Sequence, residues 1–404
     1  MNSQLTGTDQ AHLRRALELA EGGRGRVSPN PLVGAVVVRD GEAIGEGLHA
    51  ELGDLHAERA ALEDCRRRGE DPAGATMYVS LEPCAHRGRQ PPCTEAILEA
   101  GIGRVVIGSD DPSKKASGRG PGILRDGGVE VELAAGEEAT AARLLNQPFR
   151  KHARTGLPLV ILKLAMSLDG KTTTPSGGSP WISGERSREL VHRWRAEADA
   201  IAVGIGTVLA DDPLLTARSG GATRQPLRVV FDSQARLPLG SQLLRTLDES
   251  PVLVVVSPEA DSSHQIALRE AGAEVVVVDG ATSADRIQVA LAELGRRNVT
   301  SLFLEGGRSL ASAFLEADAI DEARTFVAPT LLGGPESGDP AVEGAGGGVR
   351  PGAGFFASRV APLAEDALRK TGRRARPDTP TRSQHRAVET VGEDVLITAR
   401  FKEW

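Results

Sequence analysis

In the first third of the chain, helical and strand-like patterns of apolar positions follow one another. Apolar side chains recur on one side of residues 10–21 while charged residues take the other positions, which predicts an amphipathic helix. Two apolar stretches flank Asp40-Gly41, and such a dipeptide between apolar strands predicts a hairpin turn. Helices are also predicted for "HAERAALEDCRRRG", "TEAILEAG" and residues 136–145, and strands for "ATMYVSL", "RVVIGS" and "VEVEL". This alternation indicates an α/β domain.

The pattern resumes after a polar connection with proline and glycine at residues 146–158. We place a domain boundary there, with one domain over residues 1–148 and a second over residues 149–404. The second begins with a strand, "LVILKLAMS", and Ser183 is in position to cap a helix over 184–197. After a strand "DAIAVG", further strands are predicted at 227–232, 251–256, 274–278 and 300–304, and helices at 283–295 and 308–316. This order predicts a mostly parallel sheet covered on both faces.

One long segment of the second half lacks such a pattern. Residues 333–386 are rich in glycine, proline, arginine and alanine, which predicts a mobile insertion. The apolar stretch at 393–401 then predicts a last strand that returns to the sheet.

Composition and charge exclude several classes of protein. The chain has 404 residues and a net charge of −7, and its first 148 residues hold 17 lysines and arginines against 23 aspartates and glutamates. A protein that follows a nucleic-acid backbone needs a basic surface, so this balance favours a small-molecule substrate over nucleic acid. We find no apolar run of about 18 residues, and therefore expect no membrane span. The polar start of the chain predicts no signal peptide, and three cysteines predict no disulfide framework, so we expect the reducing cytoplasm.

Two of the three cysteines belong to a metal-binding pattern. His56 and Glu58 open one predicted helix, Cys84 follows a strand, and Cys93 opens another helix, whose N-terminus favours the thiolate. Two thiolates and one imidazole supply three corners of a tetrahedral zinc site and leave the fourth open to water. Zinc would acidify that water, and Glu58 could carry its proton. We therefore predict one catalytic zinc ion per chain, in the manner of the nucleobase deaminases.

Other interpretations of these residues remain open. His86 is a rival ligand, although the His-x-Glu spacing favours His56. The zinc could serve only the fold, but three ligands with an adjacent glutamate fit the open, catalytic form better. We interpret Cys65, on the same predicted helix as Glu58, as a small residue of the core.

The long spacing in "LEPCAHRGRQPPC" closely resembles the deaminase half of the bifunctional riboflavin-biosynthesis deaminase–reductase family. The resemblance implies a cytidine-deaminase-like α/β/α domain, in which Asn30 of "SPNPLVG" would touch the base. The sequence departs from the family at four positions. Ala85 and Gln90 stand where serine and threonine are usual, and Ser113 and Lys114 replace the asparagine and second proline of a "DPNP" segment.

The second half resembles the reductase half of the same family. The order of "KLAMSLDGK", "WISG", "RAEADAIAVGIGTVLADDPLLTAR", "LRVVFDS" and "LEGGRSLASAF" carries this resemblance, which spans roughly residues 8–334 and the last strand. It implies a dihydrofolate-reductase-like α/β domain that uses NADPH. A Rossmann fingerprint is absent, because Leu209 stands where the third glycine of G-x-G-x-x-G belongs. Glu305-Gly306-Gly307, between a strand and a helix, would let backbone N–H groups approach a phosphate.

The resemblance also assigns residues of the second half to two ligands. The NADPH site would be lined by Ala165, Trp181, Thr207, Asp211, Ser233 and Gly307. The substrate would be held by Lys163, Ser179, Arg195, Leu215, Arg218 and Glu305. The guanidinium groups of Arg195 and Arg218 suit the ribose phosphate, although each could be an ordinary surface charge. The sequence suggests no proton donor for the reduction.

These observations predict a two-domain enzyme that acts on a phosphorylated pyrimidine. By the resemblance, the first domain hydrolyses the 2-amino group of a diaminopyrimidinone ribosylamine phosphate, and the second reduces the opened ribosyl chain to ribityl with NADPH. We also expect a homo-oligomer. Two alternatives remain, a nucleic-acid deaminase with an appended domain and a non-catalytic zinc-stabilised scaffold, and the acidic first half and Glu58 respectively weigh against them.

Overall fold

The computed structural model describes residues 5–87, 90–114, 116, 118–172, 181–218, 224–333 and 383–404. The chain divides into two compact units, each built from more than one segment. The first unit consists of Met1–Leu159, Leu294–Ser301 and Glu403–Trp404, and the second of Val160–Glu293 and Leu302–Lys402. The two units are described separately below.

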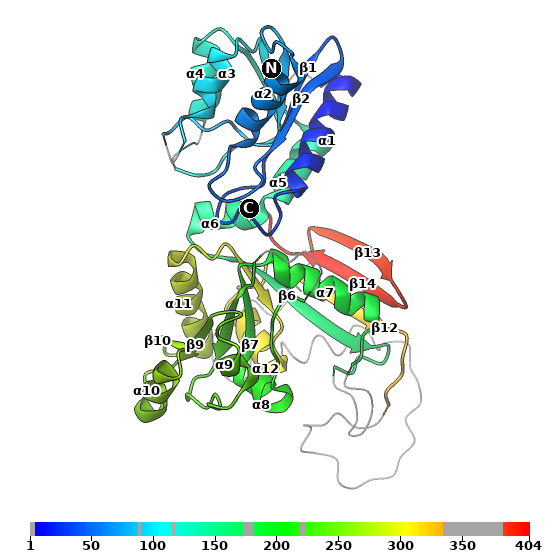
Figure 1. Cartoon of the computed structure of the whole chain (residues 1–404). Coiled ribbons are helices and arrows are strands. Elements are labelled where there is room, and N and C mark those ends of the chain that lie inside the picture. Colours follow the sequence, from blue (N-terminus) through cyan, green and yellow to red (C-terminus); the bar gives the residue numbers. More distant parts are fainter. Residues whose placement is uncertain are drawn as a thin grey trace. The chain divides into compact units, whose positions relative to one another are not determined.

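The first unit contains a five-stranded sheet in the order β2-β1-β3-β4-β5 (Figure 1). Its strands are β1 (Gly34–Arg39), β2 (Glu42–Leu48), β3 (Thr76–Val79), β4 (Arg104–Ile107) and β5 (Glu130–Leu133). β1 pairs antiparallel with β2 and β3, whereas β3, β4 and β5 run parallel. The predicted hairpin turn is confirmed, because Asp40 and Gly41 join β1 to β2 with φ values of 51° and 85°. Only glycine adopts such angles freely, while aspartate tolerates them.

Helices cover both faces of this sheet. They are α1 (Gly7–Glu21), α2 (Ala57–Arg68), α3 (Cys93–Glu99), α4 (Arg119–Asp126), α5 (Gly136–Leu145) and α6 (Gln147–Thr155). Side chains of α2, α3 and α4 share one apolar cluster with alternate residues of the strands, and α1 packs with the intervening residues, including Val36 and Tyr78. The close approach of α2 to β2 depends on Gly47, where an added Cβ would lie 2.3 Å from the amide nitrogen of Ala61. This contact fixes the helix whose first turn carries His56 and Glu58.

The last residues of the chain belong to the first unit. The backbone N–H of Trp404 donates to Oε1 of Gln147 over 2.8 Å, and Nε of Arg150 donates to the carbonyl oxygen of Trp404 over 2.6 Å. Arg143 forms an ion pair with Glu403 over 2.8 Å. The C-terminal dipeptide therefore packs on α5 and α6.

The second unit contains a nine-stranded sheet in the order β10-β9-β8-β7-β11-β6-β12-β14-β13. Its strands are β6 (Leu159–Ser167), β7 (Ala200–Gly204), β8 (Leu227–Phe231), β9 (Val252–Val256), β10 (Glu274–Val277), β11 (Ser301–Leu304), β12 (Glu322–Ala328), β13 (His385–Val391) and β14 (Asp394–Arg400). Strands β10, β9, β8, β7 and β11 are parallel in succession, and β6 is parallel to β12. The mostly parallel sheet is thus confirmed, with an antiparallel edge formed by β14 and β13.

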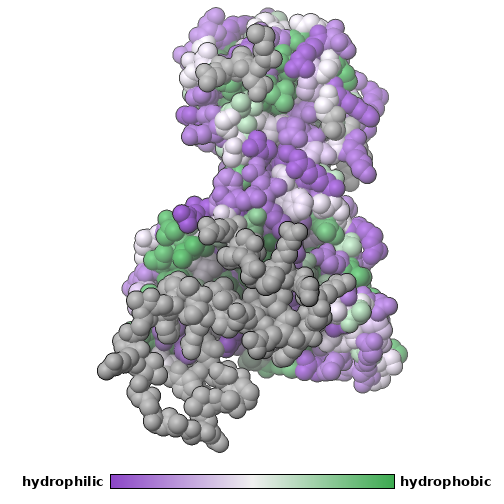
Figure 2. Space-filling view, turned by 180° about the vertical axis from the view of Figure 1, so that it is seen from behind, coloured by the Kyte–Doolittle hydropathy of each residue, from purple (hydrophilic) through white to green (hydrophobic). Residues whose placement is uncertain are grey.

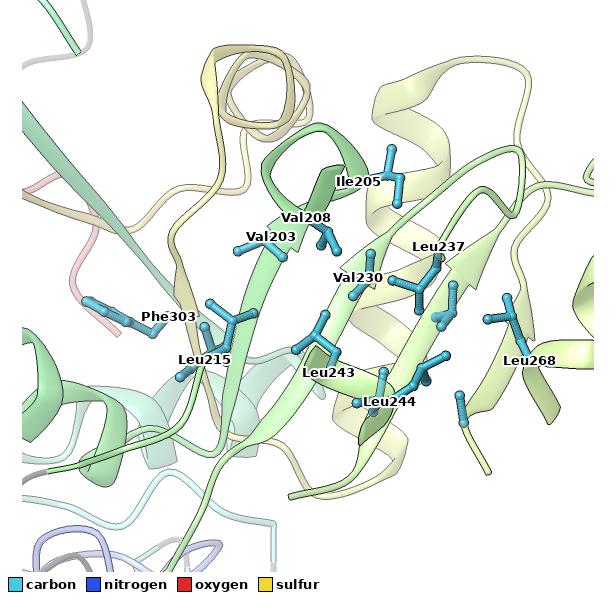
Figure 3. Close-up of a cluster of buried hydrophobic side chains, with 14 of the residues drawn as sticks. Val203, Ile205, Val208, Leu215, Val230, Leu237, Leu243, Leu244, Leu268 and Phe303 are labelled. Carbon is cyan, nitrogen blue, oxygen red and sulfur yellow. The ribbon is translucent and has the colours of Figure 1, made fainter. Parts of the chain in front are cut away.

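Both faces of the central strands of this second sheet are buried, whereas the edge strand β13 is exposed along most of its length. Its helices are α7 (Glu185–Glu197), α8 (Ile205–Asp211), α9 (Gln242–Arg245), α10 (Ser262–Glu270), α11 (Ser283–Arg296) and α12 (Arg308–Glu316). Figure 3 shows one face, where Val203 and Val230 project from neighbouring strands among Val208, Leu237 and Leu243. The alternate residues of β7 point to the opposite face and are buried as well. Parallel strands that are covered twice need such continuous apolar sequences.

Three sequence predictions about the elements are wrong. The connection at 146–158 contains α6, because a proline is tolerated in a first helical turn and Gly156, with φ of 73°, ends the helix. Gly184, not Ser183, precedes α7, since its N–H donates to Oδ2 of Asp394 over 2.8 Å. The predicted insertion does not extend to residue 386, because β13 begins at His385. The rest of that segment, 334–382, lies outside the described residues.

Among the described residues, none of the helices has the length and apolar character needed to cross a membrane. In the view of Figure 2, hydrophilic side chains cover most of the described surface, with hydrophobic patches between them.

Candidate functional site

Three potential metal ligands meet at one edge of the first sheet. His56 is the residue that precedes α2, Cys84 follows β3, and Cys93 is the first residue of α3, as predicted. Nδ1 of His56 lies 3.5 Å from Sγ of Cys84 and 3.4 Å from Sγ of Cys93, and the three ligand atoms all lie within 4.8 Å of one another. Tetrahedral zinc with ordinary bond lengths needs a nitrogen–sulfur edge of about 3.6 Å. The observed spacing therefore fits a zinc ion.

The protonation of the two thiols supports the same fit. A hydrogen bond from Cys93 lowers the pKa of Cys84 to about 4, while the bond to Cys84 and burial raise the pKa of Cys93. The hydrogen bond to Cys84 also raises the pKa of His56. These shifts make Cys84 the thiolate and leave the proton on Cys93. A divalent cation would hold both thiols deprotonated.

Glu58 lies beside these ligands in the first turn of α2. Its side chain is buried, and burial, together with the negative charge of Cys84, raises its pKa to about 7. A carboxyl group with such a pKa can both take up and release a proton near neutral pH. Arg59 donates to the carbonyl oxygen of Pro92 over 3.0 Å, which ties α2 to the start of α3.

A second histidine lies next to His56 and was missed by the sequence reasoning. The rings of His49 and His56 are 5.4 Å apart in an edge-on arrangement. Nδ1 of His49 contacts the carbonyl oxygen of Leu55 at 3.1 Å, and the Asn30 amide contacts its Nε2 at 3.1 Å. Burial lowers the pKa of His49, so it is a neutral ring that donates through Nδ1 and accepts through Nε2. Asn30 is thereby held beside His49, whose ring neighbours His56, and the contact of Asn30 with the base stays a prediction.

The rival ligand His86 is not part of the ligand cluster found among the described residues, which consists of His56, Cys84 and Cys93. Cys65 is buried on α2 within the apolar cluster of the first unit, as predicted.

In the second unit, two strand–helix junctions meet where the strand order reverses. The chain proceeds outward from β7 to β8, β9 and β10, whereas β11 pairs with the other side of β7. Ligands of open parallel sheets bind at such a switch point, beyond the carboxyl ends of the strands. Gly307 precedes α12, and a Cβ added there would lie 3.8 Å from Oγ1 of Thr207. Two residues predicted to line the NADPH site are therefore neighbours.

The charged residues predicted for the substrate of the second unit also come together. Arg195 donates through Nε and one terminal nitrogen to the two carboxylate oxygens of Glu305, over 2.6 and 2.9 Å. Burial opposes ionisation of Glu305, but the charge and hydrogen bonds of Arg195, together with the charge of Lys163, outweigh it, so the pKa of Glu305 is lowered. Burial likewise lowers the pKa of Lys163, and Glu305 opposes that shift. The three side chains form one partly buried charged group.

Arg218 differs from Arg195 in its partners. Its terminal nitrogens contact Oγ1 of Thr216 and Nε2 of His192, both over 3.3 Å. Burial and the charges of Arg195 and Arg218 lower the pKa of His192, so this ring stays neutral. Arg218 thus keeps its positive charge beside neutral groups. Sequence reasoning missed His192, since a lone histidine on a helix carries no signal.

The other predicted residues of the second unit are more scattered. Ala165 lies on β6, Asp211 ends α8, and Ser233 follows β8. Trp181 is 59% exposed, with the Arg188 guanidinium 5.4 Å from its ring centre. The remaining two are Leu215, which is buried with φ of 54°, and Ser179, which lies outside the described residues.

Comparisons with known proteins match both halves. A family model described as the cytidine and deoxycytidylate deaminase zinc-binding region matches residues 6–109, and one described as the RibD C-terminal domain matches residues 158–348. The riboflavin biosynthesis protein RibD of Actinobacillus pleuropneumoniae is 44% identical over 341 residues, which cover 84% of this chain and 88% of that protein. RibD of Escherichia coli strain K12 is 39% identical over 346 residues, with coverages of 80% and 89%.

Solved structures agree over the whole length. A diaminohydroxyphosphoribosylaminopyrimidine deaminase/5-amino-6-(5-phosphoribosylamino)uracil reductase from Thermotoga maritima superposes with a TM-score of 0.77 at 34% identity, covering 98% of this chain and 99% of that one. Acinetobacter baumannii RibD gives a TM-score of 0.76 at 34% identity with the same coverages. The predicted fold classes of the two halves are confirmed by these matches.

Proposed function

Because the chain belongs to the RibD family of bifunctional riboflavin-biosynthesis enzymes, which combine a deaminase with a reductase, we propose which groups carry each reaction. The first unit hydrolyses the amino group of diaminohydroxyphosphoribosylaminopyrimidine. The second unit reduces the ribosyl chain of 5-amino-6-(5-phosphoribosylamino)uracil, with NADPH as the reductant. Both substrates are those in the name of the Thermotoga maritima relative. Membership in this family, which spans both halves, favours this function over a nucleic-acid deaminase or a scaffold.

His56, Cys84 and Cys93 would hold one zinc ion in the first unit, and zinc held by three protein ligands would supply an acidified water molecule. Glu58 would take one proton from the water whose oxygen adds to the carbon that bears the amino group, and pass it to the ring nitrogen that loses its double bond to that carbon. Glu58 would then carry the remaining hydroxyl proton to the amino nitrogen, so that the carbon–nitrogen bond breaks, ammonia leaves and a carbonyl remains. Asn30, held by His49, faces the pyrimidine ring from the side.

The observation that carries this proposal is the convergence of two thiols and an imidazole beside a buried carboxyl group. The imidazole and the two thiols come from three different local elements, and the spacing of the sulfur and nitrogen atoms is that of one tetrahedral ion. A site that only stabilised the fold would have no need of Glu58, whose burial costs free energy.

In the second unit, the residues at the switch point between β7 and β11 would hold NADPH, which supplies a hydride to the sugar carbon when bound. Backbone N–H groups at Gly306 and Gly307 would be open to its phosphates, since neither residue has a side chain to keep them away. The Arg195–Glu305 pair and Lys163 orient the polar groups of the substrate, and Arg218 binds its phosphate, because its charge is not neutralised by a carboxylate as that of Arg195 is. Ala165, Trp181, Asp211 and Ser233 complete the cofactor side, and Leu215 and Ser179 the substrate side.

The test is to assay the purified full-length protein for both half-reactions. We expect ammonia release from the diaminopyrimidine and, with the deaminated intermediate, oxidation of NADPH. Removal of metal by a chelator should abolish ammonia release, leave reduction of the supplied intermediate unchanged, and be reversed by added zinc. A chelator-treated protein that still releases ammonia would contradict the zinc assignment. Failure to oxidise NADPH would contradict the reductase function of the second unit.

A further inference from the structure

Glu82 is a buried carboxylate that binds backbone rather than a cation. It lies two residues before Cys84, and its side chain is 5% exposed. Its Oε2 accepts from the N–H groups of Asp111 over 3.4 Å and Gly118 over 3.2 Å, and its Oε1 accepts from the N–H of Gly120 over 3.3 Å. The segment that connects β4 to α4 is thereby fixed at both ends by one side chain.

The hydrogen bonds to Gly118 and Gly120 have a clear physical basis. Gly118 precedes α4, and Gly120 is in its first turn, where backbone N–H groups have no partner within the helix. A carboxylate at a helix N-terminus satisfies such groups and interacts favourably with the helix dipole. Glu82 therefore caps α4 from another part of the chain.

A buried cation holds the same segment from its other side. Arg150 of α6 is 1% exposed, and it donates to the backbone carbonyl of Asp110 over 2.7 Å and to its carboxylate over 3.0 Å. The neighbouring Asp111 is also buried, and its carboxylate accepts from the N–H of Ser113 over 2.7 Å. Glu82 thus holds Asp111 through its backbone N–H, and Arg150 holds the preceding Asp110 through its backbone C=O.

The segment lies directly against the backbone that leads to Cys84. A Cβ added to Gly120 would lie 2.3 Å from the carbonyl oxygen of Pro83, so only glycine allows this approach. Since β3 and β4 are adjacent and parallel, Cys84 and the 111–118 segment both follow the carboxyl ends of their strands, at the same edge of the sheet. The segment is therefore in position to form one wall of the deaminase site.

We propose that Glu82 is a positioning residue of the deaminase, which holds the backbone of Asp111, Gly118 and Gly120 against the Cys84 strand end so that the described residues 111–114 form a wall for the pyrimidine substrate. The inference rests on the deaminase function proposed above. It also explains how this chain keeps the segment in place with Ser113 and Lys114 where its relatives in the family resemblance have asparagine and proline. Glu82 and Arg150 bind backbone groups and the Asp110 carboxylate, and not the side chains of Ser113 and Lys114.

Glu82→Gln tests the proposal in the full-length, zinc-loaded protein. Glutamine replaces one acceptor oxygen by an NH2 group, whose hydrogens then face backbone N–H hydrogens at one end of the segment. We expect KM for the diaminopyrimidine to rise about tenfold, the effect of losing one hydrogen bond to a charged group. We expect kcat at saturating substrate to stay within about threefold of the parental value. Zinc content should remain one ion per chain.

Two glycines of α4 provide a matched pair that leaves the carboxylate intact. Gly120→Ala adds a methyl group against the carbonyl oxygen of Pro83, whereas a Cβ at Gly122 has no neighbour within 4 Å. Gly120→Ala should raise KM as Glu82→Gln does. Gly122→Ala should keep the parental KM and kcat, since alanine is the better helix former.

Three outcomes would overturn the proposal. One is a parental KM in both Glu82→Gln and Gly120→Ala. Another is a fall in kcat with KM unchanged, which would mean that Glu82 only keeps a fraction of the protein folded. The last is loss of zinc from Glu82→Gln, which would mean that it acts through Cys84. If Glu82→Gln is insoluble, the comparison of Gly120→Ala with Gly122→Ala decides. Failure of the parental protein to release ammonia would instead refute the deaminase function itself.

Discussion

The two candidate sites differ in how their charged groups are balanced. In the first unit, the ligand atoms of His56, Cys84 and Cys93 lie within 4.8 Å of one another and form no ion pair with a carboxylate among the described residues. In the second unit, Arg195 and Glu305 already neutralise each other through a bidentate ion pair. The first site is therefore complete only with a metal, whereas the central ion pair of the second is formed before any ligand binds.

This difference implies that the two activities fail in different ways. Loss of one ligand in the first unit removes the metal and with it the chemistry. Loss of one partner in the second unit leaves the other charge buried and unpaired, which changes binding and orientation by a graded amount. The predictions below use this contrast, from the largest expected effect to the smallest.

Cys84→Ser should remove both zinc and ammonia release, because serine is a poor zinc ligand at neutral pH. Elemental analysis and an ammonia assay measure the two effects. Cys65→Ser is the matched control, because Cys65 is buried in the apolar cluster and is not one of the proposed ligands. The Cys65→Ser protein should therefore keep its zinc. Undiminished zinc in Cys84→Ser would show that the ligands are wrongly assigned.

Glu58→Gln should keep zinc and lower ammonia release about 10²- to 10⁴-fold, because glutamine cannot carry the proton between water and the leaving amine. Given the deaminated intermediate and NADPH, the same protein should reduce it at close to the parental rate. Normal ammonia release would refute the role of Glu58. A folded variant that cannot oxidise NADPH would refute the separation of the two sites.

Arg195→Ala should lower kcat/KM for NADPH oxidation by about 100-fold while ammonia release is kept. Truncation of one partner in a buried ion pair typically costs about 2–5 kcal/mol, and each 1.4 kcal/mol is about tenfold. Arg195→Lys should lose less, because it keeps the charge but not the bidentate geometry. Equal kcat/KM values for Arg195→Ala and Arg195→Lys would show that neither the charge at this position nor its pairing with Glu305 determines the rate of NADPH oxidation.

A smaller effect concerns the carboxylate Asp9, which lies in the first unit but in neither site. Tyr78 donates to Asp9 over 2.8 Å, and burial, together with that carboxylate, raises the pKa of Tyr78 to about 12 from an ordinary value of 10.0. The stability that protonated Tyr78 contributes is therefore complete below pH 10.0 and is lost as pH rises towards about 12.

Asp9→Asn should lower the Tyr78 pKa but keep it above 10.0, since burial remains. Ultraviolet titration reports it directly, because the chain contains one tyrosine. Both activities should be unchanged at neutral pH. An unaltered titration curve would mean that the Asp9 carboxylate has no influence on the phenol.

Local patterns made a large part of this structure predictable. The turn at Asp40-Gly41 and the helix that opens at Cys93 depend on neighbouring residues, and the sequence predicts both correctly. The metal ligands also lie on short local motifs at strand ends and helix starts. Their meeting in space follows from the α/β alternation, which brings the carboxyl ends of parallel strands to one edge.

Contacts between distant parts of the sequence were not predictable in this way. Gly184 precedes α7 because Asp394, 210 residues later, accepts its N–H, so the local signal at Ser183 was misleading. The helix α6 was mistaken for a polar connection because Arg150 and Lys151 are buried against partners that lie far away in sequence. Glu82 likewise binds residues 29 to 38 positions further along the chain.

The packing of the C-terminal dipeptide on α5 and α6 has a consequence for synthesis of the chain. Glu403 and Trp404 belong to the first unit, although nearly all of the second unit is translated before them. At about 5–20 residues per second, the gap between α6 and Trp404 lasts tens of seconds or less on the ribosome. During that time Arg150 lacks the carbonyl oxygen that its Nε binds in the finished protein. The first unit is therefore not completed until nearly all of the second unit has been made.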